Sequence, residues 1–170
     1  MTKRLQALFI TTCVAAVIAR GGETRPAKSF NRLAALNGTW QGTVEWNTRP
    51  GKNPIRATYQ TISNGSAVME NLIMGDTAVP SMTTIYHMDG ADLRMTHYCA
   101  AHNQPRLKAV MPAQPGSIHF AFVDGTDLAE HPAHVGEFDI RFIDPNHLVL
   151  EFTFVNGAKK SVEHIELART

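Results

Sequence analysis

The densest group of side chains that could take part in chemistry lies in residues 96–106, which read THYCAAHNQPR. His97 and Cys99 are two residues apart, a spacing that puts both on one face of a strand, and Arg106 follows a loop that contains proline. His97 could donate or accept a proton near neutral pH, while Arg106 could orient the polar head of a ligand. The alternative is a hydrogen-bonded loop in which Arg106 joins two strand ends.

Glu70 is the second candidate, because it lies in an otherwise apolar stretch. Burial would disfavour its ionised form and raise its pKa unless an Arg or Tyr partner were near. At a strand edge it would instead be a solvated carboxylate. Glu70 and His97 could serve as acid and base in a lyase or an isomerase. This enzymatic hypothesis ranks last, because the sequence shows no Ser-His-Asp or Cys-His-Asn arrangement.

The eight histidines raise a metal hypothesis, although no His-Glu-x-x-His motif occurs. His131 with His134, or His97 with Cys99, could each supply two ligands to a zinc or copper site that finds a third ligand elsewhere. His164 is a weaker candidate, as a ligand for a metal or a haem iron. Two ligands do not define a site, so we predict no metal or cofactor and keep haem as an alternative.

The elements that must position these residues are strands. Segments of alternating apolar and polar residues, several of them rich in β-branched or aromatic side chains, are typical of strands. Asn-Gly and Asp-Gly pairs at residues 64–65, 89–90 and 156–157 favour hairpin turns. The predicted strands lie near residues 39–48, 54–63, 66–75, 81–88, 91–100, 106–111, 117–123, 135–143, 147–155 and 159–167.

We therefore predict an all-β fold, a single up-and-down antiparallel β-barrel of about ten strands. A short N-terminal helix over residues 30–36, with Ser29 as its N-cap, would close one end. A closed barrel of more than about eight strands tends to enclose a cavity. The sequence therefore predicts a barrel that encloses a cavity.

Hairpin register predicts which side chains share the interior, because directly opposed residues lie on one face of a sheet. A two-residue turn at residues 89–90 would place Met82 opposite His97 and point both inward. By the same reasoning around the preceding Asn-Gly turn, Tyr59 faces Glu70. These pairs put polar groups inside the barrel.

A three-residue loop around Asn156-Gly157 would pair Phe152 with Val162 and Leu150 with His164, which turns His164 inward. The interior would then hold a few polar groups among Met and Phe side chains, the usual profile of a small-molecule site. The predicted ligand-binding residues are Tyr59, Glu70, Met82, Met95, His97, Cys99, Arg106, Phe120, Phe138 and Phe152.

The N-terminal segment has the pattern of a signal peptide, because Lys3 and Arg4 precede the mostly apolar residues 5–19. The predicted organisation is a signal peptide at residues 1–19, a flexible linker at residues 20–28 and a barrel domain at residues 29–170. We expect a periplasmic or secreted protein with no stable membrane span after cleavage. An uncleaved membrane anchor is the alternative.

Charge and cysteine content limit the kinds of binding partner and the disulfides that we expect. The formal net charge is +1 for the whole sequence and about −1 without the leader, and no basic stripe occurs, so nucleic acid is not an expected partner. Cys99 alone would remain after cleavage, which rules out an internal disulfide. We expect a small apolar molecule as the partner and leave a homodimer open.

The apolar turn Leu33-x-x-Leu36-x-Gly38-Thr39-Trp40 leads into the first predicted strand. Together with the ten-strand count, it resembles the calycin superfamily of lipocalins and fatty-acid-binding proteins, and the count is closer to the fatty-acid-binding branch. The resemblance covers most of residues 30–168. It implies a lipocalin-like barrel that carries or senses a small ligand.

The segments THYC at residues 96–99 and NQPR at residues 103–106 are similar to a group of uncharacterised exported bacterial proteins with a lipocalin-like domain. A more distant similarity is to nitrobindins, ten-stranded haem proteins whose iron is held by one His on a late strand. His164 sits at a comparable place, so this similarity implies haem ligation there. The chain departs from nitrobindins at residues 41–45, QGTVE, where they have a glycine-rich continuation.

Overall fold

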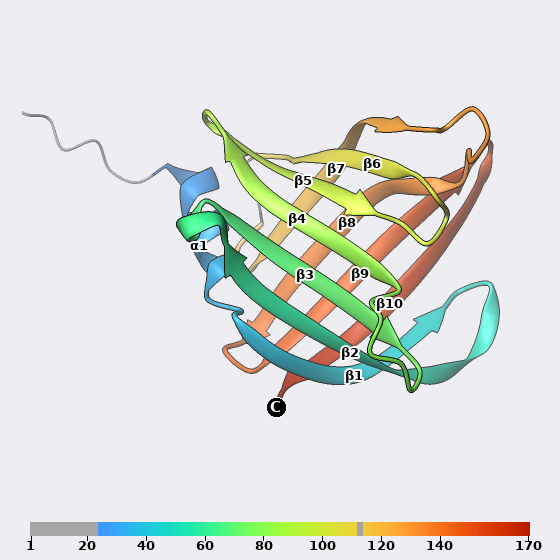
Figure 1. Ribbon diagram of the computed structural model, residues 1–170, viewed down its shortest axis with the longest axis horizontal. Coiled ribbons are helices and arrows are strands. Elements are labelled where there is room, and N and C mark those ends of the chain that lie inside the picture. The colour runs from blue at the N-terminus through green and yellow to red at the C-terminus, as the bar shows by residue number, and fades with distance from the viewer. Residues whose placement is uncertain (1–23, 112–113) are drawn as a thin grey trace, which may run out of the picture.

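The chain forms one closed barrel of ten antiparallel strands in the computed structural model, which describes residues 24–111 and 114–170 (Figure 1). Each strand pairs with its neighbours in sequence, and the first strand pairs with the last to close the ring. The predicted up-and-down barrel is therefore confirmed. The predicted signal peptide at residues 1–19 lies outside the described residues. Within those residues, no helix has the length and apolar character needed to cross a membrane.

The elements follow the predicted order. The main difference is that the second strand begins earlier than predicted, so the first hairpin is longer. The elements are α1 (Arg25–Ala34), β1 (Gly38–Trp46), β2 (Arg49–Ile62), η1 (Ser63–Gly65), β3 (Ala67–Met74), β4 (Met82–Asp89), β5 (Asp92–Tyr98), β6 (Gln104–Ala109), β7 (Ser117–Thr126), β8 (His134–Asp144), β9 (His147–Asn156) and β10 (Lys159–Arg169).

Helix α1 begins before the predicted helix. Thr24 is its N-cap, with a side chain that accepts a hydrogen bond from the backbone N–H of Ala27 at 3.4 Å. Pro26 lies in the first turn, where its missing N–H has no cost. The prediction of Ser29 as the cap is therefore wrong, and residues 25–28, which were assigned to the linker, belong to the helix.

The helix closes one end of the barrel, as predicted. Leu33 is fully buried, and Leu36, just beyond the helix, is 4% exposed. The indole Nε1 of Trp40 donates a hydrogen bond of 2.9 Å to the Leu36 carbonyl oxygen. The Arg169 guanidinium lies 4.4 Å from the Trp40 ring centroid and donates to the carbonyl oxygen of Asn37 at 2.8 Å. The last strand thus fastens the segment that covers this end.

Two hairpins differ from their predicted registers, with different consequences. His97 faces Thr84, not Met82, so the pairing of β4 with β5 is shifted by two residues. Because side chains alternate with a period of two, a shift of two leaves every residue on its predicted face. His97 is therefore inside the barrel, as predicted, and Tyr59 faces Glu70, also as predicted.

The hairpin of β9 and β10 differs by one residue, which exchanges the two faces. The loop has two residues, 157–158, and its glycine has a φ of +59°, a conformation that suits a tight hairpin. Phe152 therefore faces Glu163. His164 faces Glu151 on the outer surface, so the prediction that His164 points inward is wrong, and Glu163 takes the inward place.

Candidate ligand-binding site

A row of polar side chains crosses four neighbouring strands on the inside of the barrel. Tyr59 on β2 faces Glu70 on β3, Glu70 faces Thr84 on β4, and Thr84 faces His97 on β5. All four side chains are buried. We call these four residues the polar row.

A row of phenylalanines crosses three strands on the other side of the barrel. Phe120, Phe138 and Phe152 lie on β7, β8 and β9, with successive ring centroids 5.8 Å and 4.3 Å apart. The His97 ring lies 5.3 Å from the Phe152 ring, and the Tyr86 ring lies 5.8 Å from the Phe120 ring. The two sides of the barrel therefore meet through these rings, and the middle of the interior is packed with side chains.

Glu70 is a buried carboxyl group with one clear partner. Tyr86 donates a hydrogen bond of 2.8 Å to Glu70 Oε2. Burial raises the pKa of Glu70 to about 7, while hydrogen bonding from the neighbouring tyrosines opposes the rise. Burial and the nearby Glu70 charge raise the pKa of Tyr86 well above its ordinary value, so Tyr86 stays a donor. This contact ties Glu70 into the packed core. It gives a substrate no access to Glu70, so it does not support the acid–base hypothesis.

His97 is inside the barrel and has one free ring nitrogen. Its Nδ1 shares a hydrogen bond of 2.9 Å with Thr84 Oγ1. Its Nε2 is buried and has no hydrogen-bond partner in the part of the chain that the structure describes. Burial lowers the pKa of His97 to about 4, so the imidazole is neutral at physiological pH.

Glu163 on β10 is a second buried carboxyl group, and it was missed by the sequence reasoning because of the one-residue error in register. The side chain is 1% exposed, and its Oε1 has no hydrogen-bond partner within residues 24–111 and 114–170. Burial raises the pKa of Glu163 to about 7, and the positive charge of Arg49 opposes the rise. We call Glu163 Oε1 and His97 Nε2 the open polar atoms. Both residues adjoin Phe152, one across the β9–β10 pair and one by ring contact.

The β1–β2 hairpin lies at the end of the barrel opposite helix α1 (Figure 1). A hollow of about 470 Å³ lies next to this hairpin. Trp46, which is directly opposite Glu163, is one of its walls. The Arg49 guanidinium lies 3.7 Å from the Trp46 ring centroid. The hollow is lined by Val44, Trp46, Arg49, Pro50, Asn53, Pro54, Met74 and Gly75. Trp46 links this hollow to Glu163, although Glu163 is not itself among the lining residues.

Cys99 lies just beyond β5 at this open end and is half-buried. Burial raises the pKa of its thiol, and the charge of Glu163 raises it further, so the sulfur is protonated at neutral pH. A protonated thiol is a weak nucleophile and a weak metal ligand.

Arg106 points to the outer surface, so the prediction that it orients the polar head of a ligand at the rim is wrong. Pro105, Leu107 and Ala109 are the buried residues of β6, and strand alternation turns Arg106 outward. Its Nε and Nη2 donate to the two carboxylate oxygens of Asp124 at 2.6 Å and 2.9 Å. Arg106 therefore joins β6 to β7, in agreement with the structural alternative for this segment.

His164 is also engaged on the outer surface. Its Nδ1 lies 3.2 Å from Glu151 Oε1, and its Nε2 lies 3.5 Å from Glu166 Oε1. β10 thus presents no inward histidine to a haem iron, so His164 cannot be the haem ligand that the nitrobindin similarity implies.

The histidines of the loops have separate partners. His131 Nε2 lies 3.6 Å from Asp127 Oδ2, and His134 Nδ1 lies 2.7 Å from the Pro132 carbonyl oxygen. Among the residues described, no group of three or more His, Cys, Asp or Glu side chains is placed to hold a metal ion. The other predicted ligand-binding residues, Met82, Met95, Phe120, Phe138 and Phe152, are buried in the interior.

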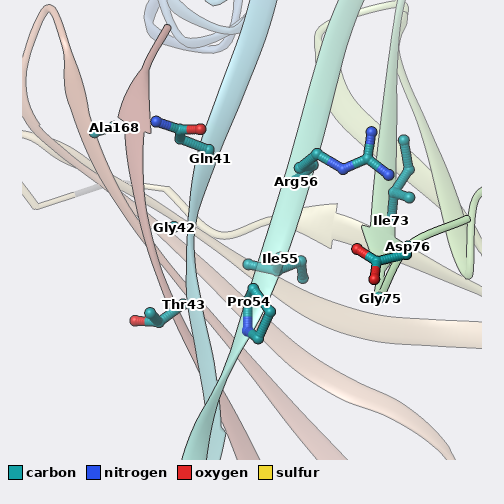
Figure 2. Close-up of a pocket in the computed structure, with 10 residues that line it drawn as sticks. All are labelled: Gln41, Gly42, Thr43, Pro54, Ile55, Arg56, Ile73, Gly75, Asp76 and Ala168. Atoms are coloured by element: carbon teal, nitrogen blue, oxygen red, sulfur yellow. The ribbon is translucent and has the colours of Figure 1, made fainter. Parts of the chain in front are cut away.

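A hollow of about 540 Å³ lies on the outer face of β1 and β2 (Figure 2). Gln41, Thr43 and Arg56 line it, and these residues alternate with the inward residues of the same strands. Arg56 Nη2 already donates to the Thr77 carbonyl oxygen. Neither hollow is lined by an open polar atom, but the hollow at the open end has Trp46, the cross-strand neighbour of Glu163, as a wall, so the open end of the barrel is the better candidate site.

No protein-family model and no curated protein matches the chain. Among solved structures, the chain is similar to Rv2717c from M. tuberculosis, with 16% identity, a TM-score of 0.55, and coverage of 84% of this chain and 97% of that one. It also aligns with a protein of unknown function of the DUF3598 family from Nostoc punctiforme, with 12% identity, a TM-score of 0.45 and coverage of 80% and 48%. The likeness to Rv2717c is one of fold and agrees with a calycin-like barrel.

Proposed function

We propose that the protein binds a small, mostly apolar molecule at the open end of its barrel, as a carrier or a sensor. The observation that carries the proposal is the pair of open polar atoms beside Phe152, behind the hollow formed by Trp46 and Met74. A buried polar atom left without a hydrogen bond costs about 1–3 kcal/mol. A ligand that bonds to these atoms would recover that free energy, which gives the site a reason to bind.

The surroundings fit a ligand that has an apolar body and a polar group. Val44, Trp46 and Met74 contribute apolar surface to the hollow, and Arg49 and Asn53 contribute polar surface. Phe152 is the cross-strand neighbour of Glu163. The packed contact between the polar row and the phenylalanine row limits the ligand to the open half of the barrel. A largely apolar site with a few convergent polar groups is the usual form of a small-molecule site.

Filling the hollow tests the proposal. We expect the neutral apolar fluorophore N-phenyl-1-naphthylamine to bind the wild-type chain and to gain fluorescence on binding. Met74→Trp, which places a larger side chain in the hollow, should weaken binding by about tenfold or more.

Met69→Trp is the matched control, because Met69 lies on the outer face of the same strand, β3. It should bind the fluorophore as the wild type does. Equal binding by both variants would place the fluorophore elsewhere, and no binding by the wild type would contradict the proposed function.

A further inference from the structure

The charges at the open end are few and opposite in sign. Glu163 can carry a negative charge, whereas the His97 imidazole and the Cys99 thiol are neutral at physiological pH. Arg49 is the cation that acts on Glu163. Arg49 is exposed on the first hairpin, while Glu163 is buried in the barrel wall.

Arg49 shows how a cation fits this end of the barrel. Its guanidinium lies 3.7 Å from the Trp46 ring centroid, in the geometry of a cation–π interaction. Its charge acts on Glu163, yet Glu163 Oε1 receives no hydrogen bond from it or from any other described residue. Arg49 thus contacts the Trp46 ring without a hydrogen bond to Glu163 Oε1.

From this arrangement we infer that the ligand is an organic cation, an apolar body with a primary amine or guanidinium head, and that Arg49 lies where that head would bind. The inference rests on the proposed function and names its ligand class. The head would lie on the Trp46 ring and donate a hydrogen bond to Glu163 Oε1. It would displace the Arg49 guanidinium into solvent, where that group is well hydrated.

Glu163, Arg49 and the Trp46 ring disfavour ligands with other polar head groups. A carboxylate would be repelled by ionised Glu163, with Arg49 at the surface as the opposing charge. A neutral hydroxyl could bond to Glu163 Oε1 but would gain neither the charge-assisted bond nor the interaction with the Trp46 ring. A cation gains both, so this head should bind most tightly.

Three probes that share one apolar body separate these alternatives. They are 1-naphthylmethylamine, 1-naphthalenemethanol and 1-naphthoic acid, titrated into the full chain by isothermal titration calorimetry. We expect the amine to bind about tenfold more tightly than the alcohol, and the acid to bind most weakly. The affinity for the amine should rise with pH through about 7, as Glu163 ionises, while Arg49 stays charged and His97 and Cys99 stay neutral.

Two variants locate the effect. Glu163→Gln should reduce the affinity for the amine to that for the alcohol and leave the alcohol within about twofold of wild type. Arg49→Gln, a change at an exposed position, should increase the affinity for the amine several-fold, because the competing guanidinium is gone. The control is Glu166→Gln, an outward carboxylate on the same strand, which should change none of the affinities.

The outcomes distinguish the two proposals. Equal affinities for the amine and the alcohol, or a preference for the amine that survives Glu163→Gln, would overturn the cation inference and leave the proposed function intact. No binding of any of the three probes would contradict the proposed function itself. An unchanged or weaker affinity for the amine in Arg49→Gln would overturn the inferred position of the head even if Glu163→Gln failed to fold.

Discussion

Each end of the barrel carries a tryptophan ring covered by an arginine guanidinium, and the two pairs differ in what surrounds them. At the closed end, Trp40 is 1% exposed, bonds the Leu36 carbonyl oxygen and is covered by Arg169 at 4.4 Å. At the open end, Trp46 is partly buried and is covered by Arg49 at 3.7 Å. The interaction between ring and cation is the same in the two pairs, but the number of additional hydrogen bonds differs.

The difference separates a structural contact from a displaceable one. Arg169 also donates to three backbone carbonyl oxygens, those of Ala35, Asn37 and Pro145, at 3.1 Å, 2.8 Å and 3.4 Å. Arg49 is exposed and contacts Trp46, whose cross-strand neighbour Glu163 has a buried carboxyl oxygen without a hydrogen bond in the described chain. The contacts at the closed end therefore stabilise the fold, whereas the open end has a buried carboxyl oxygen without a hydrogen bond beside a hollow.

The largest expected effect is at the closed end. Trp40→Ala removes a fully packed side chain and its hydrogen bond, so we expect the free energy of unfolding to fall by about 3–5 kcal/mol. Trp46→Ala removes a partly buried ring and should cost about 1–2 kcal/mol. Urea denaturation followed by circular dichroism measures both. Equal losses would mean that the two ends contribute alike to stability, and the comparison would fail.

A smaller effect follows from the buried carboxyl of Glu163. Its pKa in the folded state, about 7, is above its ordinary value of 4.5, so the folded chain binds the proton more tightly than the unfolded chain. The stabilisation is full below the ordinary pKa and is lost as the pH rises through about 7. Glu163→Gln should therefore gain stability relative to wild type by about 2 kcal/mol between pH 5 and pH 8.

The measurement is the difference in the free energy of unfolding between variant and wild type, because the contributions of Glu70 and His97 cancel in that difference. Glu166→Gln is the control. The pKa of Glu166 is lowered, chiefly by its hydrogen bond with His164, so its ionisation does not change over this range. A difference for Glu163→Gln that stayed constant from pH 5 to pH 8 would contradict the burial of an unbonded carboxyl.

The hairpins show what the sequence could and could not predict about this site. Alternation and turn residues predicted a closed ten-strand barrel, because period-two patterns and tight turns are local properties. At residues 89–90, the predicted register was off by two, and His97 still pointed inward. At residues 157–158, it was off by one, and the inward residue became Glu163 instead of His164.

The error at the second hairpin could not be detected from alternation, since residues 162–165 mix apolar and polar types on both faces. A two-residue loop at Asn-Gly is the favoured hairpin geometry, and applying it there would have found Glu163. The placement of Arg106 failed for a related reason. The predicted strand began at Arg106, directly after a loop at the rim, whereas the strand begins at Gln104 and its inward face is formed by Pro105, Leu107 and Ala109.

The smallest expected effect compares the two arginines directly. Arg169→Gln removes the cation above Trp40 and its hydrogen bonds to three carbonyl oxygens, so the free energy of unfolding should fall by about 1–2 kcal/mol. Arg49→Gln, at an exposed position, should change stability by no more than about 0.5 kcal/mol.

Guanidinium chloride titrations of the two variants beside wild type resolve a gap of this size, and the order of the losses is what matters. If Arg49→Gln lowered the free energy of unfolding as much as Arg169→Gln, the Arg49 guanidinium would have a structural role. A ligand could then displace it from the Trp46 ring only at a large loss of stability. If Arg49→Gln leaves stability unchanged, the contact at 3.7 Å contributes little to folding. The Trp46 ring is then a surface on which another cation can take the place of Arg49.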